Sequence, residues 1–168
     1  MRKSAMIVGC LALVFAATGC GDKSGDEGTW AESARVPAAA EDAAYDGKYF
    51  SMTVASGWVS EPQNGGRVIF LPKDGWIPKI GFDFEDMGDG PGTAEEAVKA
   101  IIARFDGSPM ESTEIGGVEF KTTTYKFAGS TLTTHIAFRK GTKINITIED
   151  DDAEDPDIRA MLGSVAFK

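Results

Sequence analysis

The fold of this chain is decided by the stretch STLTTHIAFRKGTKINITIED, residues 130–150. Two runs rich in β-branched residues flank a Lys-Gly-Thr segment, which is the layout of an antiparallel hairpin. If residues 140–142 form a three-residue loop, the opposed pairs are Phe138 with Ile144, Ile136 with Ile146, and Thr134 with Ile148. This register gives the hairpin one largely apolar face, as a sheet packed on one side requires.

Further strands are expected on the N-terminal side of this hairpin. Residues 116–127 read GGVEFKTTTYKF and make a meander with the hairpin, while an alternating strand is expected in KYFSMTV, residues 48–54. The runs RVIFLP (67–72) and KIGFDFED (79–86) read as two more strands. In the last of these runs Ile80, Phe82 and Phe84 share one face.

Two helices interrupt the strands. Thr93 and Glu96 have the spacing of a capping box, and a stripe of apolar residues follows them to Phe105. A second helix begins with Asp155 as N-cap and Pro156 at its first position, ends at Gly163, and precedes a short strand over residues 165–167. The order β-β-β-α-β-β-β-α-β indicates an α+β fold, a mostly antiparallel β-sheet covered by helices.

The first nineteen residues have the layout of a secretory signal peptide. Arg2 and Lys3 precede an apolar run over residues 5–17, which is too short to span a membrane. The closing letters AATGC resemble the lipobox of bacterial lipoproteins, although Ala17 stands where leucine is usual. The resemblance implies cleavage before Cys20 and a diacylglyceryl or acyl lipid, such as palmitate, on its thiol. The protein is then anchored in the bacterial cell envelope, facing outside the cytoplasm.

Other readings of the two cysteines stay open. Cys10 and Cys20 could pair in a disulfide if the signal were retained, or conventional cleavage could leave Cys20 unmodified. Lipidation could also occur at Cys10, in MIVGC, but only residues 5–9 would then form the apolar core of the signal. Lipidation of Cys20 is favoured, because it also explains why an exported chain has no cysteine pair.

Residues 20–46 have the acidic, Gly- and Ala-rich composition of a flexible tether, and a domain is expected over residues 47–168. Within that domain YFSMTVASGW, GGVEF, KGTKINITI and SVAF are similar to segments of the PsbP-like superfamily. The resemblance implies an α/β/α sandwich. Characterised members of that superfamily act mostly by binding partners, so the resemblance does not fix a function.

Charge narrows the range of partners. The 168 residues carry a formal net charge of −9 with a pI near 4.6, which disfavours a nucleic-acid partner and predicts none. The same charge repels anionic lipid headgroups, so attachment to the lipid membrane is expected through the N-terminal anchor rather than through a basic patch.

Few residues offer catalytic chemistry. The single histidine, His135, is out of phase with the apolar face of its strand, so we expect it to be exposed or half-covered. One histidine without a cysteine partner does not build a zinc site, and no Gly-x-Ser-x-Gly motif occurs. These observations favour a protein that is not an enzyme, and leave a hydrolase as a distant alternative.

The acidic run EDDDAEDPD, residues 149–157, is the candidate metal site, with Asp150, Asp152, Glu154 and Asp155 as possible calcium or manganese ligands. EF-hand spacing fails, because the sixth position is Asp155 instead of glycine and the twelfth is Met161 instead of glutamate. A solvated loop that leads into a helix explains the same letters.

Trp76 is the candidate partner contact. It lies in PKDGWIPK, a turn with lysines on an otherwise acidic protein, although both Trp58 and Trp76 also fit core or edge positions. The sequence therefore predicts a non-enzymatic, membrane-anchored lipoprotein that binds an unknown envelope protein or other envelope component. The alternative is a ligand- or cation-binding protein that uses its acidic loops.

Overall fold

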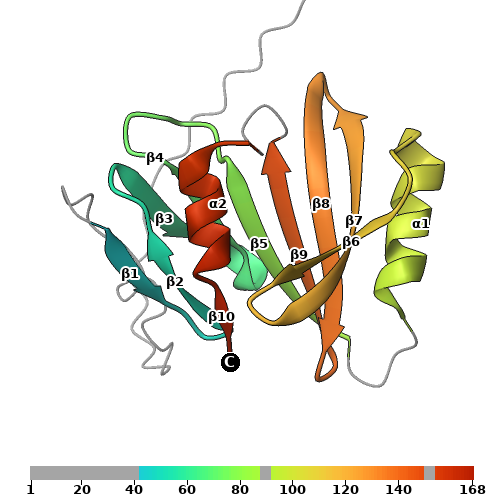
Figure 1. Ribbon diagram of the computed structural model, residues 1–168, viewed down its shortest axis with the longest axis horizontal. Coiled ribbons are helices and arrows are strands. Elements are labelled where there is room, and N and C mark those ends of the chain that lie inside the picture. Colours follow the sequence, from blue (N-terminus) through green and yellow to red (C-terminus); the bar gives the residue numbers. More distant parts are fainter. Residues whose placement is uncertain (1–41, 88–91, 150–153) are drawn as a thin grey trace, which may run out of the picture.

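The computed structural model describes residues 42–87, 92–149 and 154–168. Ten strands form two sheets, one of seven strands in the order β3-β4-β5-β9-β8-β7-β6 and one of three in the order β1-β2-β10 (Figure 1). All pairings between these strands are antiparallel. The strands are β1 Ala43–Asp46, β2 Phe50–Val54, β3 Trp58–Pro62, β4 Val68–Pro72, β5 Ile80–Asp86, β6 Glu111–Ile115, β7 Val118–Phe127, β8 Ser130–Arg139, β9 Thr142–Glu149 and β10 Ala166–Phe167. The helices are α1 Ala94–Phe105 and α2 Pro156–Gly163, with a short 3-10 turn η1 at Asn64–Gly66. The predicted α+β class is confirmed.

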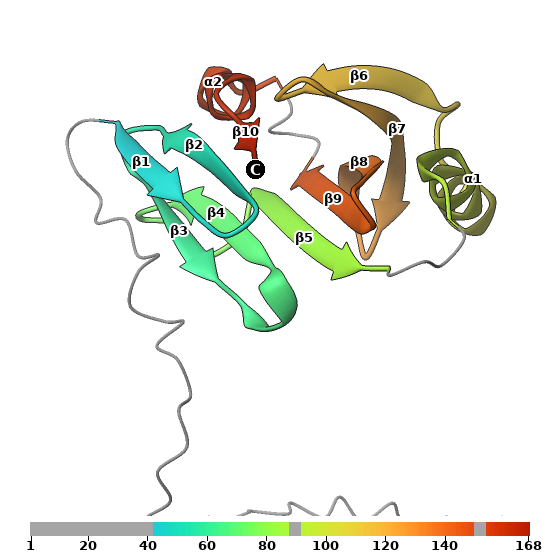
Figure 2. The same ribbon diagram turned by 90° about the horizontal axis from the view of Figure 1, so that it is seen from below.

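The seven-stranded sheet is curved, and its two faces are covered by different elements. Figure 2 shows the small sheet and α2 on the concave side, whereas α1 lies on the other side against β7. Strand β8 is therefore buried on both faces, with Thr134 and Ile136 toward one side and Ala137 toward the other.

An aromatic cluster joins the small sheet to the large one. Phe50 of β2 stacks on Phe82 of β5 with ring centroids 4.4 Å apart, and Tyr45 meets Phe70 edge-on at 5.5 Å. The predicted shared face of β5 is confirmed, since Ile80, Phe82 and Phe84 are all buried. These rings belong to the core cluster that joins the two sheets.

The register predicted for the deciding hairpin is wrong by one residue. The loop has two residues, Lys140 and Gly141, both at positive φ (50° and 75°). A two-residue loop with positive φ at both positions matches the twist of the two strands that it joins. The opposed pairs are Ala137 with Ile144, His135 with Ile146, and Thr133 with Ile148.

The N-terminal boundary of the folded region also differs from the prediction. Residues 43–46, placed at the end of the tether from their alanine-rich composition, form β1 and pair with β2. Tyr45 explains the pairing, because its ring is buried against Phe50 and Phe70. Two further strands, β3 and β6, were not predicted from the sequence.

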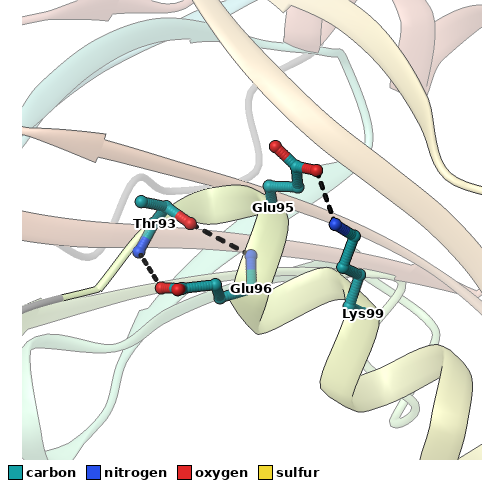
Figure 3. A network of polar contacts seen from close by, with 4 residues as sticks. All are labelled: Thr93, Glu95, Glu96 and Lys99. Carbon is teal, nitrogen blue, oxygen red and sulfur yellow. Dashed lines mark hydrogen bonds and ion pairs between the residues drawn. The ribbon is translucent and has the colours of Figure 1, made fainter.

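Both predicted helix starts are confirmed. Thr93 Oγ1 accepts a hydrogen bond from the Glu96 amide (3.1 Å) and Glu96 Oε2 accepts one from the Thr93 amide (3.2 Å), as Figure 3 shows. Lys99 adds an ion pair with Glu95 on the same helix. At α2, Asp155 is the N-cap and Pro156 opens the helix.

The two ends of the large sheet carry different connections. The upper end in Figure 1 carries the β4–β5 connection (residues 73–79) and the β7–β8 turn (128–129), and the lower end carries the β8–β9 turn (140–141). Neither described helix combines the length and apolar character needed to cross a bilayer.

Candidate functional site

A depression of about 90 Å³ opens at the lower end of the large sheet. Its lining residues are Tyr49, Phe84, Arg139, Lys140, Thr142, Ile144, Phe167 and Lys168. The space corresponds to about three water molecules, enough for a carboxylate or a similarly small group.

The floor of this depression is aromatic. Tyr49, which precedes β2, stacks on Phe84 of β5 with ring centroids 4.4 Å apart and planes within 9° of parallel. Phe167 of β10 lines it as well and packs on Phe120 of β7. The floor thus depends on the pairing of β10 with β2, which brings the end of the folded region beside its beginning.

The rim of the depression is basic. The turn after β8 supplies Arg139 and Lys140, and Lys168 donates to Asp46 Oδ1 (2.5 Å) and to the Gly47 carbonyl (2.8 Å). Lys48 lies over the Tyr49 ring at 4.8 Å. In the part of the chain that the structure describes, Arg139 and Lys140 have no carboxylate partner.

Among the described residues, seven of the thirteen lysines and arginines pair with carboxylates and six do not. Across residues 42–87, 92–149 and 154–168, seven cations pair with carboxylates: Arg67, Lys79, Lys99, Lys121, Lys143, Arg159 and Lys168. Two of the six unpaired cations, Arg139 and Lys140, line the same depression as the aromatic rings. A guanidinium and an ammonium beside apolar rings suit a carboxylate attached to an apolar group.

The sequence reasoning did not find this site. The letters RKGTK, residues 139–143, are visible in the chain, but the aromatic partners come from β5, from β10 and from the residue before β2. Only the sheet topology brings them together, so the basic turn was the one available signal.

Trp76 lies far from this depression, in the β4–β5 connection at the upper end. Its side chain is 87% exposed and that of Ile77 is 46% exposed, so the core or edge interpretation of Trp76 is wrong. Trp58, by contrast, is buried and donates from Nε1 to Asp157 Oδ2 (3.3 Å) at the start of α2.

Of the four candidate metal ligands in the acidic run, the structure describes Glu154 and Asp155. Asp150, Asp152 and Cys20 lie outside the described residues. Glu154 pairs with Arg159 of α2, and Asp155 Oδ1 accepts from the Asp157 amide (2.8 Å) as the helix cap. Within the described ranges, no group of three or more His, Cys, Asp or Glu side chains is arranged to hold a metal.

The expectation that His135 is exposed or half-covered is wrong. Its side chain is only 9% exposed, because it lies on the concave face of β8 with Ala137 and stands opposite the buried Ile146 of β9. Burial lowers the pKa of His135 to about 4, and its Nδ1 lies 2.8 Å from Thr122 Oγ1. The imidazole is therefore neutral at pH 7 and serves as a core group hydrogen-bonded across the strands.

Comparison with solved structures identifies the fold. The chain is similar to the solution structure of cyanobacterial PsbP (CyanoP) from Synechocystis sp. PCC 6803, with a TM-score of 0.55. The alignment covers 86% of this chain and 100% of that one. The fold is PsbP-like. Sequence identity is 12%, so the likeness concerns the PsbP-like fold alone.

No protein-family model matches the sequence, and no curated protein matches it either. The expected PsbP-like architecture is thus supported by structure, whereas a function must be argued from the residues of this chain.

Proposed function

We propose that this protein is a membrane-anchored extracytoplasmic lipoprotein whose PsbP-like domain binds another envelope component without catalysing a reaction. The lipid on Cys20 holds the chain to the membrane, and the domain presents a recognition site to a partner. The signal sequence and the lipobox resemblance support the anchor.

The basic depression at the lower end is the observation that carries the binding role. Arg139 and Lys140 line the same depression as the Tyr49–Phe84 stack and have no carboxylate partner among the described residues, so a carboxylate can be met by two cations while its apolar neighbour contacts the rings. The partner is therefore a molecule that offers a carboxylate beside an apolar group, such as an acidic segment of an envelope protein.

Phenylacetate is a suitable probe for the depression. In NMR titrations of the purified chain, phenylacetate should shift the amide signals of residues around 139–142, and neutral phenylacetamide should not. Arg139→Gln and Lys140→Gln should each weaken the response. Lys126→Gln, which removes an unpaired cation at the opposite end, is the matched control. Equal responses to both probes would contradict charge recognition at this site.

The anchor has its own test. Cys20→Ala should release the protein from membranes in cell fractionation, whereas Cys10→Ala should leave it bound. Retention of the Cys20→Ala protein on membranes would overturn the lipoprotein proposal.

Cation binding by the acidic run is the alternative proposal. Calorimetry of the full chain with calcium and with manganese tests it directly. Absence of heat at millimolar ion would remove it, and heat lost in Asp150→Asn and Asp152→Asn variants would favour it.

A further inference from the structure

The upper end of the domain carries a group of exposed apolar side chains. Trp76 is 87% exposed, Ile77 is 46% exposed and Phe127 is 53% exposed, and these are the large apolar side chains left exposed in the part of the chain that the structure describes. Exposed apolar side chains on neighbouring connections at one end of a domain indicate an interaction surface.

These residues belong to neighbouring connections. Glu149 of β9 connects the β4–β5 connection with the start of β8. One of its carboxylate oxygens pairs with Lys79 Nζ (3.0 Å), and the other accepts a hydrogen bond from Ser130 Oγ (2.9 Å). Ser130 lies opposite Phe127 in the β7–β8 register. Figure 1 shows both connections along the same edge of the large sheet.

The chain enters the domain at this same end. Asp42, the first described residue, accepts a hydrogen bond from the Ser56 amide (3.1 Å), and the next residue, Gly57, accepts one from the Lys73 amide (2.7 Å). Lys73 opens the loop that carries Trp76. Any tether that runs from Cys20 to Asp42 therefore arrives beside the exposed apolar group.

Unpaired cations accompany the apolar side chains. In residues 42–87, 92–149 and 154–168, Lys73 and Lys126 have no carboxylate partner, and both are exposed. Arg104 lies over the Phe105 ring, which itself contacts Phe127 edge-on at 5.7 Å. Aromatic tips flanked by lysine and arginine suit the boundary between acyl chains and lipid headgroups.

We propose that the upper end is a lipid-docking surface, in which Trp76, Ile77 and Phe127 enter the headgroup boundary of the bilayer. The inference rests on the proposed lipid anchor and names the membrane as the partner of Trp76. The tether predicted over residues 20–46 has 22 residues (20–41) before the described domain, and a flexible chain of that length has a reach of about 25 Å, so the anchor keeps this surface close to the bilayer. At such a high effective concentration a modest insertion suffices.

The docked orientation has a consequence for the rest of the domain. The basic depression lies at the opposite end of the same strands, so it points away from the membrane. One end of the domain then meets lipid and the other is open to a partner in the envelope.

A label at the upper end measures insertion directly. Ile77→Cys keeps Trp76, and in the acylated mature chain it offers a free thiol for a nitroxide. Gln63→Cys, an exposed position that follows β3 at the lower end, is the matched control. The labelled proteins are bound to vesicles of phosphatidylethanolamine and phosphatidylglycerol, and flotation is measured together with nitroxide accessibility to oxygen and to a nickel chelate.

Docking predicts that both proteins float, and that the label at residue 77 is several-fold more accessible to oxygen relative to the chelate than the label at residue 63. Adding Trp76→Ser should return the label at residue 77 to water while flotation persists. An unchanged thermal melting temperature shows that this variant is folded.

Other results would overturn the inference. Flotation with both labels in water would remove lipid docking and leave the anchor standing. Absence of flotation would remove the proposed anchor and docking together. A label at residue 77 that is protected in cell membranes, yet aqueous on the protein-free vesicles, would assign the surface to a protein instead of lipid.

Discussion

At the lower end of the large sheet Phe84 is 6% exposed and stacks on Tyr49, whereas at the upper end Trp76 is 87% exposed and extends from a loop. Both ends carry unpaired cations, but at the lower end they line a depression with packed aromatic rings, and at the upper end they accompany exposed side chains. The comparison separates two uses of aromatic residues. Those at the lower end hold the sheets together and shape a small site, while those at the upper end are free to bury area against something else.

Removal of an aromatic group from the lower end should have the largest effect. Phe84→Ala should lower the free energy of unfolding by about 3–5 kcal/mol, because it opens a cavity beside Tyr49 and Phe50. Urea unfolding followed by circular dichroism measures the loss. A loss below about 1 kcal/mol would mean that the lower end is not held by its rings.

Between the two ends, His135 should make stability depend on pH. The unfolded chain binds a proton at this residue near pH 6.5, but the folded chain binds one only near pH 4. Lowering the pH from 6.5 to 4 therefore favours unfolding, by about 3 kcal/mol in total, and the contribution is constant below pH 4.

The measurement compares wild type with His135→Gln in urea unfolding across that pH range. The variant should lack this part of the pH dependence. Because the chain has a single histidine, NMR of its ring signals is an independent check, and titration of the folded protein near pH 6.5 would contradict the prediction.

A pair of glycines tests how tightly the lower end is closed. Gly116 and Gly117 both have positive φ, but a Cβ at Gly116 would lie 2.6 Å from the Val165 carbonyl oxygen, whereas at Gly117 it meets open space. Gly117→Ala should cost about 1 kcal/mol through its left-handed backbone alone. Gly116→Ala should cost about 2 kcal/mol or more, since the chain leading into β10 must also move. Equal losses in urea unfolding would show that the contact is not tight.

The smallest effect is expected at the upper end. Trp76→Ser combined with Ile77→Ser should change the free energy of unfolding by no more than about 0.5 kcal/mol, because both side chains already face solvent. A large loss in thermal or urea unfolding would mean that these residues support the fold, and the contrast between the ends would fail.

The parts of this fold that could be predicted from the sequence are those with local causes. The caps at Thr93 and Asp155 are short-range hydrogen bonds, and the alternation in β5 reports one buried face directly. The α+β class followed from the order of such segments.

The parts that could not be predicted depend on long-range packing. The exposure of His135 depended on which face of β8 packs into the core, and its neighbours on that face, Ala137 and Ile146, belong to the core cluster. The hairpin register depended on Lys140, which has a left-handed backbone conformation that non-glycine residues seldom adopt. Arg139 and Lys140 became a candidate site only through aromatic rings brought from three other strands.

The two-residue strand β10 has a consequence for the order of events in folding. It pairs with β2, and Ser164 just before it accepts a hydrogen bond from the amide of Thr53, 111 positions earlier. The small sheet and the floor of the depression therefore stay incomplete until β10 is in place. Contacts this distant in sequence close slowly. A chain exported as proposed would remain without its finished core during passage across the membrane, and would close only after β10 had emerged.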